Sequence, residues 1–124
     1  MSMAKTETNR AAFALKCVEN EAGKPHAKEY KSYCKKIPSL IMTNGLAAAI
    51  SFVFAKKPRN PAYECIYQNI TKWLVETGNI PQDADLIDHI VNIDSPEYRF
   101  LSIEIIALFE WLSRFAEGKI EGEV

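Results

Sequence analysis

Few side chains in this sequence could carry out acid-base or metal chemistry. Histidine is the side chain that can titrate near neutral pH without perturbation, and the two histidines, His26 and His89, lie far apart in the chain. Asp85 and His89 are spaced i and i+4, so they would share a helix face, on which Asp88 could join them as a metal ligand. An acidic helix start beside an exposed histidine explains the same residues, and no further His or Cys cluster completes a ligand set. We therefore expect no metal site.

An apolar segment near the C-terminus holds two carboxylates, Glu104 and Glu110. At about 100° per residue they would lie about 120° apart around a helix, so they do not converge as an acid-base pair. A carboxylate in such a segment needs compensation, and we expect Glu104 to pair with a Lys or Arg of another helix. The sequence also has no phosphate loop of the form GxxxxGK[ST]. It therefore predicts no catalytic residue, no cofactor and no enzymatic activity.

The basic side chains are ordered more clearly. Lys28, Lys31 and Lys35 follow helical spacing, each one position after an apolar residue, so they form a ridge beside a buried face. A solvated lysine face gives the same pattern, but the first half of the chain has few acids to compensate it. Such a ridge would bind phosphates, with weak sequence preference and strong salt dependence. Our candidate nucleic-acid-binding residues are Arg10, Lys16, Lys28, Lys31, Lys35 and Lys36.

Two neighbouring features could extend this ridge. Lys56, Lys57 and Arg59 lie in the connection KKPRNP and join the ridge if the flanking helices pack side by side. Tyr33 could stack on exposed bases, whereas Tyr30 lies on the apolar stripe and is expected in the core.

The two halves of the chain have opposite charge. Residues 1–59 hold eleven basic and four acidic side chains, a net +7, whereas residues 60–124 hold four basic and twelve acidic ones, a net −8. This asymmetry favours a nucleic acid or an anionic surface as the partner of the basic half. The alternative is a protein adaptor whose basic half docks onto an acidic protein and binds no nucleic acid.

Composition predicts one domain over residues 1–124, because 124 residues with 48% hydrophobic content can form a core. Cys17, Cys34 and Cys65 are odd in number and widely spaced, which predicts reduced core residues. Residues 1–12 lack the apolar region of a secretion signal. The uncharged stretch 37–55 is interrupted by polar residues, proline and glycine, and its apolar run after Gly45 is roughly half of the ~20 residues that a membrane span requires. We therefore expect a cytoplasmic location and no membrane contact.

The apolar spacing is helical throughout, which predicts a compact all-α bundle of about five to seven helices. The expected helices start near Thr6 or Thr8, near His26, at a cap formed by Thr43 or Asn44, after Asn60, near Asp83 and at Asp94 or Ser95. Pro38 predicts a kink or an early stop in the second. The last, to about Glu117, is apolar on almost all sides, so we expect it to be packed on several sides as the central helix. Residues 1–5 and 119–124 are expected to be loose ends.

Residues 10–116 carry, in order, a set of residues that resembles a known family. They are Arg10-Ala11, Ala14, Tyr30, Lys36-Ile37-Pro38, Asn44-Gly45-Leu46, Phe52, Trp73-Leu74, Asp94-Ser95, Tyr98-Arg99, Glu104, Trp111-Leu112 and Arg114-Phe115-Ala116. The chain resembles a shorter form of the small helical subunit of the Cmr-type (type III-B) CRISPR effector complex. Within this set Pro38, Asn44, Gly45 and Trp111 look architectural.

The resemblance implies a compact all-α subunit present in more than one copy. Its partners would be the other Cmr-type subunits, further copies of itself, and guide RNA and target RNA held through backbone contacts. In that family RNA cleavage belongs to other subunits, which implies a non-catalytic role here. The third possibility, a small metal-dependent hydrolase or nuclease, would depend on Asp85 and His89.

Overall fold

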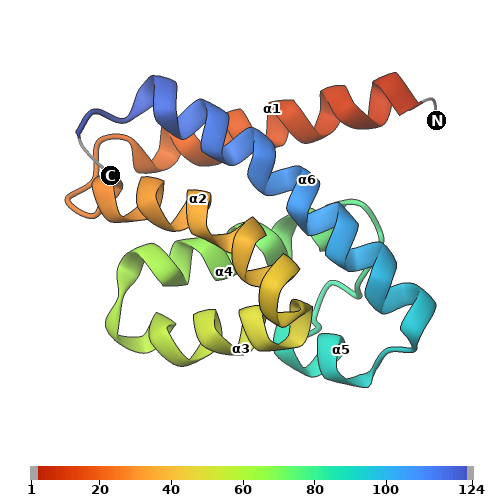
Figure 1. Ribbon diagram of the computed structural model, residues 1–124. Helices are drawn as coiled ribbons and strands as arrows, with labels where there is room; N and C mark the ends of the chain where they lie inside the picture. Colours follow the sequence, from red (N-terminus) through yellow and green to blue (C-terminus); the bar gives the residue numbers. More distant parts are fainter. Residues whose placement is uncertain (1–2, 123–124) are drawn as a thin grey trace.

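The structure is a computed structural model that describes the backbone of residues 3–122 and the side chains of residues 6–122. Within this part there are six α-helices, one 3₁₀ helix and no β-strand, so the all-α prediction is confirmed (Figure 1). The elements are α1 (Met3–Glu21), α2 (Ala27–Asn44), α3 (Leu46–Lys56), η1 (Lys57–Arg59), α4 (Pro61–Glu76), α5 (Leu86–Asn92) and α6 (Ser95–Lys119).

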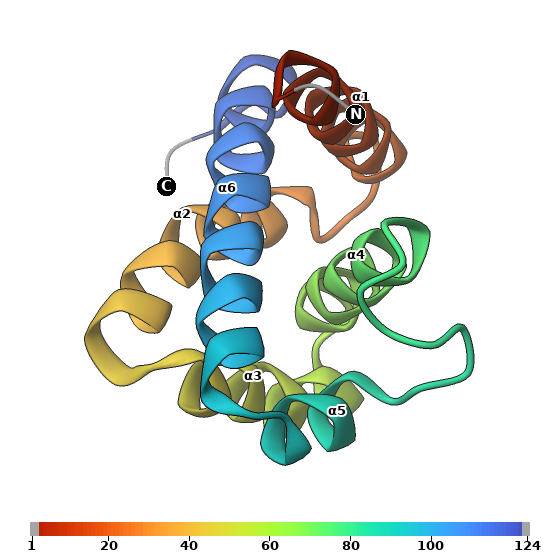
Figure 2. The same ribbon diagram turned by 90° about the vertical axis from the view of Figure 1, so that its right-hand side faces the viewer.

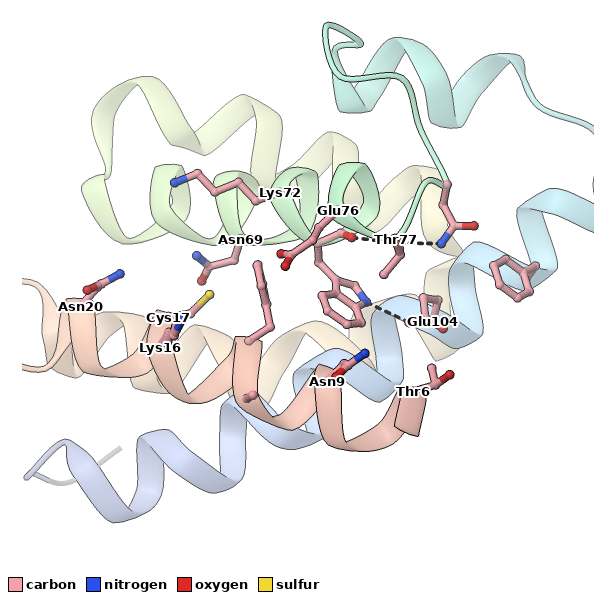
Figure 3. A pocket seen from close by; sticks show the side chains of 15 residues that line it. Thr6, Asn9, Lys16, Cys17, Asn20, Asn69, Lys72, Glu76, Thr77 and Glu104 are labelled. Carbon is pink, nitrogen blue, oxygen red and sulfur yellow. Dashed lines mark hydrogen bonds between the residues drawn. The ribbon is translucent and has the colours of Figure 1, made fainter. Parts of the chain in front are cut away.

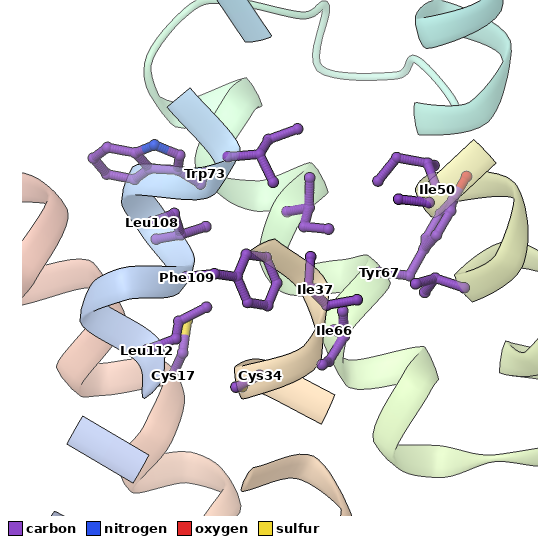
Figure 4. Close-up of a cluster of buried hydrophobic side chains, with 14 of the residues drawn as sticks. Cys17, Cys34, Ile37, Ile50, Ile66, Tyr67, Trp73, Leu108, Phe109 and Leu112 are labelled. Carbon is purple, nitrogen blue, oxygen red and sulfur yellow. The ribbon is translucent and has the colours of Figure 1, made fainter. Parts of the chain in front are cut away.

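Helix α6 crosses the molecule and packs against both α1 and α2 (Figure 1). It runs from α5, at its N-terminal end, to α1 and the start of α2, at its C-terminal end (Figure 2). Helix α2 also contacts α3 and α4, and α3 contacts α4 and α5. The helices therefore share one hydrophobic core, in which Phe109 of α6 meets Ile37 of α2 and Ile66 of α4 (Figure 4). Full burial of each such side chain contributes about 1.5–3 kcal/mol.

Helix α2 continues through Pro38 to Asn44. Of the two predicted outcomes, a kink or an early stop, the early stop is therefore wrong. A proline inside a helix removes the N–H that would bond the carbonyl four residues earlier, here that of Cys34. The hydroxyl of Ser113 in α6 donates to this carbonyl oxygen at 2.9 Å. The packed helix therefore supplies the hydrogen bond that the proline removes.

The expected cap of α3 at Thr43 or Asn44 is wrong, because both residues belong to α2 and Gly45 is the N-cap. Gly45 has φ +91°, a region that favours glycine, and a Cβ there would lie 3.3 Å from the hydroxyl oxygen of Tyr98. That hydroxyl accepts a hydrogen bond from the Ala47 amide at 2.8 Å, so a side chain from α6 satisfies the first turn of α3.

The caps predicted for the two following long helices are confirmed. Asn60 accepts hydrogen bonds from the amides of Ala62 and Tyr63 at the start of α4, at 3.0 and 3.3 Å. Asp94 accepts from the amide of Glu97 at the start of α6, at 3.0 Å. Both are the side-chain contacts that Asn and Asp favour at helix starts.

Helix α6 is not packed on all sides. Its buried residues face α1, α2 and α4, but Phe100 is 52% exposed and Ile103 is 69% exposed. The helix is packed on several sides, as expected, but the outer side of its N-terminal half exposes apolar residues to solvent. None of the helices in residues 3–122 is both long and apolar enough to span a bilayer.

The backbone near both ends is described only in part, so the expected loose ends remain a prediction. Helix α1 begins at Met3, and Ile120 after α6 is buried, with its amide donating to the Ala116 carbonyl oxygen at 2.9 Å. Residues 1–2 and 123–124 lie outside the described part.

Cys17 and Cys34 are buried and Cys65 is half-buried, all without disulfides as predicted. Burial raises the pKa of all three thiols, that of Cys17 to about 11, so they are protonated at neutral pH.

Candidate nucleic-acid interface

The predicted lysine ridge on α2 is divided by packing against α6. Lys31 is only 4% exposed, and its ammonium group donates to the carbonyl oxygens of Ile120 at 2.9 Å and Gly122 at 3.1 Å. It holds the segment after α6 against α2. A buried ammonium group with two hydrogen bonds has a structural role and is not presented to a phosphate.

The lysines on either side of Lys31 are exposed. Lys35 forms an ion pair with Glu117 of α6 at 2.6 Å, and hydrogen bonding from Lys35 lowers the pKa of that carboxyl. Lys28 extends along the backbone at Gly122, where a Cβ would lie 2.6 Å from the lysine Cε. The ridge therefore runs beside the C-terminal end of α6, and an acidic residue neutralises part of it.

Arg10 is engaged in the core of the bundle. Its guanidinium group binds the Glu104 carboxylate with two nitrogen-to-oxygen distances of 3.0 Å, and the indole N–H of Trp73 donates to the same carboxylate at 2.8 Å. The prediction that Glu104 pairs with a basic residue of another helix is confirmed. Arg10 thus joins α1 to α6 and is only slightly exposed, which separates it from the ridge on α2. Lys16, further along α1, is exposed and faces α4 across a cavity.

Lys36 lies apart from the ridge and meets the connection between α3 and α4. Its ammonium nitrogen is 5.7 Å from the ring centroid of Tyr33 and 5.8 Å from that of Phe52, and Lys56 lies 5.5 Å from the Phe52 ring. Lys57 lies 5.6 Å from the ring centroid of Phe54. We call this region the basic aromatic surface, and it consists of Tyr33, Lys36, Phe52, Phe54, Lys56, Lys57 and Arg59.

The aromatic part of this surface is held in place by stacking. Tyr33 stacks on Tyr63 with ring centroids 3.8 Å apart, and Phe52 meets Tyr63 edge-on at 5.6 Å. The amide of Asn60 donates to the Tyr33 hydroxyl at 3.1 Å. Cations beside ordered, partly exposed rings are the combination that binds phosphates and unpaired bases together.

Three cations of this surface, Lys36, Lys56 and Arg59, form no ion pair within residues 6–122, whereas Lys57 lies 3.7 Å from Glu64. The packing of α2 on α3 and α4 places Lys36, and not the ridge, beside the connection between α3 and α4. Phe54 is 41% exposed and Phe52 is 36% exposed, although both belong to the apolar helix α3. Helix α3 has more apolar residues than one buried stripe can hold. This excess is the feature of the sequence that could have indicated an exposed apolar face.

The residues considered for a metal site do not converge. Asp85 accepts a hydrogen bond from the Tyr67 hydroxyl at 2.6 Å, whereas His89 contacts Glu97 of α6 at 3.1 Å. Burial, followed by the hydrogen bond to Asp85, raises the pKa of Tyr67. Within residues 6–122 no group of three His, Cys, Asp or Glu side chains could hold a metal ion.

Comparison with known proteins identifies the family. Residues 6–119 match the family model described as CRISPR-associated protein (Cas_Cmr5). The fold is that of a CRISPR-associated Cmr5 family protein from Thermus thermophilus, with a TM-score of 0.78 and 23% identity over 98% of this chain and 100% of that chain. The chain therefore belongs to the CRISPR-associated Cmr5 family, the small accessory subunits of the type III-B Cmr complex.

Proposed function

We propose that this protein is a non-catalytic structural subunit of the RNA-guided Cmr ribonucleoprotein in the cytoplasm. It helps to seat guide RNA and target RNA through its basic aromatic surface and packs against neighbouring subunits, including further copies of itself. The observation that carries the RNA contact is the placement of Lys36 and Lys56, which form no ion pair within residues 6–122, at 5.8 and 5.5 Å from the centroid of the exposed Phe52 ring.

The non-catalytic role is supported by the separation of the polar groups. Asp85 and His89 each bind a different partner side chain, and Glu104 is held by Arg10 and Trp73. A general acid or base needs a second group within hydrogen-bond reach and access to a substrate. Family membership points the same way, since it makes the chain an accessory subunit.

The mode of RNA contact follows from the chemistry of the surface. Lys36, Lys56 and Arg59 would bind phosphates, which gives affinity without sequence preference, and Phe52 would stack on an unpaired base. Lys28 and Lys35 extend the candidate contact along α2, and Lys16 is a separate candidate on α1. Arg10 and Lys31 are excluded from our proposed set by their structural contacts.

The test is a matched pair of charge-reversal variants of the full chain. Lys36→Glu with Lys56→Glu should weaken binding of a labelled oligouridylate by at least about tenfold in fluorescence anisotropy. It should also reduce the slope of log affinity against log salt by about 1.4, or ~0.7 per phosphate contact. The control, Lys72→Glu with Arg114→Glu, changes net charge equally on exposed positions in the acidic half of the sequence. Equal binding by the two variants would overturn the assignment.

A second candidate function is a protein adaptor that binds no RNA. It is favoured by the exposed Phe100 and Ile103 of α6, an apolar side that suits a protein neighbour. If no RNA binding is detected at low salt, but Phe100→Ser with Ile103→Ser prevents assembly with the other subunits, the adaptor function holds.

A further inference from the structure

One side of α6 is left open by the helices that pack against it. On the covered side, Glu104 points toward α1 and α4, and the Trp73 indole N–H donates to it at 2.8 Å (Figure 3). Ile103, one position earlier, points about 100° away around the helix and is 69% exposed. An apolar side chain thus faces solvent in a helix that otherwise anchors the core.

Four residues of the open side follow one stripe along α6. Arg99, Ile103, Ile106 and Glu110 are spaced by four, three and four positions, which is the spacing of the seam between paired helices. At 100° per residue they fall within about 60° of one another around the axis. Ile106 is half-buried and the other three are exposed. We call these four residues the α6 stripe.

The charges at the two ends of the α6 stripe have no partner among the described residues. The ion pairs that α6 forms within residues 6–122 use Glu97, Glu104, Glu117 and Lys119. Arg99 and Glu110 take part in none of them. They lie eleven positions apart, about 16 Å along the helix, so they cannot pair with each other.

Helix α2 adds apolar area beside the α6 stripe. Lys35 pairs with Glu117 near the C-terminal end of α6, and Gly45 approaches Tyr98 near its N-terminal end, so the two helices run antiparallel. Met42 follows Lys35 by seven positions, or about two turns, and therefore lies on the same side of α2, toward α6. It is 74% exposed. The open surface is thus wider than the stripe alone.

We propose that the α6 stripe pairs with the same stripe of a second copy of this chain, in an antiparallel two-fold arrangement. A two-fold axis through the middle of the stripe sets Arg99 of each copy opposite Glu110 of the other, and Ile103 opposite Ile106. The inference deepens the proposed packing of the protein against further copies of itself and rests on that part of the proposed function. It does not depend on the RNA contact.

Charge complementarity is the reason for choosing a second copy as the occupant. The spacing four, three, four is the same in both directions, and the charges at its ends are opposite, so an antiparallel copy carries the complementary stripe. A parallel copy would set Arg99 against Arg99 and Glu110 against Glu110. A nucleic acid would be repelled by Glu110 and would leave the isoleucines without an apolar partner.

The size of the contact sets its strength. A stripe of about 16 Å on one helix is shorter than the contacts in permanent dimers. We therefore expect a reversible dimer, which forms when the local concentration is high, as it is when several copies are held in one assembly.

Sedimentation equilibrium of the full chain over a range of concentrations measures the pairing. Arg99→Glu should weaken the dimer by at least about tenfold, because both symmetry-related ion pairs become repulsive. Lys72→Glu makes the same charge change at an exposed position of α4 and is the matched control, which should pair as the wild type does.

A mixing experiment tests the antiparallel arrangement. Glu110→Arg should weaken the dimer as Arg99→Glu does, but an equimolar mixture of the two variants should pair at least about as tightly as the wild type. In the mixed dimer, one chain offers two acids and the other offers two bases, so both contacts are attractive again.

The pairing and the RNA contact can fail separately. Ile103→Ser should abolish the dimer and leave the binding of oligouridylate unchanged, whereas Lys36→Glu with Lys56→Glu should do the reverse. A wild-type chain that stays monomeric up to about 1 mM would overturn the proposal. Equal pairing by Arg99→Glu and Lys72→Glu would also overturn it, as would a mixture that pairs no better than either variant alone.

Discussion

Glu104 is the residue on which three helices depend. It lies in α6, and it accepts hydrogen bonds from Arg10 of α1 and from Trp73 of α4. These contacts satisfy both carboxylate oxygens in a site that excludes most solvent. A buried pair of this kind is costly to break because removal of one partner leaves the other charge uncompensated.

Glu104→Gln should therefore destabilise the protein by about 3 kcal/mol, because the Arg10 guanidinium loses its counter-charge. Urea unfolding followed by circular dichroism measures this change. Glu110→Gln, on an exposed position of the same helix, is the matched control and should change stability by no more than about 0.5 kcal/mol. A similar loss in both variants would show that the ion pair has no special role.

Lys31 provides a second test at the residue scale, because its ammonium group holds two backbone carbonyl oxygens after α6. Lys31→Met keeps the apolar stem of the side chain but removes the hydrogen-bond donor. It should lower the free energy of unfolding by about 2 kcal/mol. Amide hydrogen exchange at Ile120 should accelerate. Lys36→Met, on an exposed position of α2 beside Tyr33 and Phe52, should leave the exchange at Ile120 nearly unchanged. Unaltered exchange at Ile120 in the Lys31 variant would contradict the structural role.

At the scale of elements, the junction between α1 and α2 depends on Glu21. Burial alone would raise the pKa of its carboxyl, but hydrogen bonds from Cys65, His26 and Lys24 outweigh burial and lower it. Because the pKa is lower in the folded than in the unfolded chain, this group stabilises the fold above the ordinary value of 4.5. The contribution is lost as pH falls through the lower folded value.

Stability should consequently decrease between about pH 5 and pH 2 more steeply in the wild type than in Glu21→Gln. Thermal unfolding monitored across this range measures the difference. Glu19→Gln, an exposed residue of the same helix, provides the comparison for a carboxylate near the end of α1. Parallel pH profiles for the wild type and Glu21→Gln would contradict the assigned role.

The Pro38 site couples α2 to α6 through a single hydrogen bond from Ser113 to the Cys34 carbonyl. Ser113→Ala should lower the free energy of unfolding by about 1 kcal/mol. The control is Ser102→Ala, since the Ser102 hydroxyl donates to the Tyr98 carbonyl within α6, and it should change the free energy of unfolding very little. In a Pro38→Ala background the new backbone N–H can bond Cys34, so Ser113→Ala should cost less. A double-mutant cycle measures this coupling, and additive effects would refute it.

The sequence predicted those elements whose signals are local. Asn60 and Asp94 marked helix starts because a cap uses residues two or three positions away. It left open whether α2 bends or stops at Pro38, because the compensating hydroxyl belongs to Ser113, far along the chain. The cap of α3 was missed for the same reason, since Tyr98 of α6 satisfies its amide.

The candidate site was predicted in part, and the errors have one cause. Spacing identified Lys28, Lys31 and Lys35 as one ridge on α2, but it could not show that residues after α6 would cover Lys31. Nor could it show that Arg10 would be needed to neutralise Glu104. Long-range packing decides which lysines and arginines reach solvent.

For the molecule as a whole, folding partly neutralises the opposite charges of the two halves of the sequence. Cations of the first half pair with acids of the second, as in Arg10 with Glu104 and Lys35 with Glu117. The basic aromatic surface keeps its charge because Lys36, Lys56 and Arg59 have no such partner among the described residues. The positive charge that has no acidic partner among the described residues is therefore a local patch and does not extend over the whole basic half.

The most direct test of this account is photo-crosslinking of the full chain to RNA that contains 4-thiouridine, followed by mass spectrometry of the crosslinked peptides. We predict crosslinks in the segments that hold Tyr33 and Lys36, and Phe52 through Arg59, with yields that fall sharply as salt is raised. Crosslinks confined to α1 and α4, or to the end of α6, would contradict the central claim that RNA contacts the basic aromatic surface.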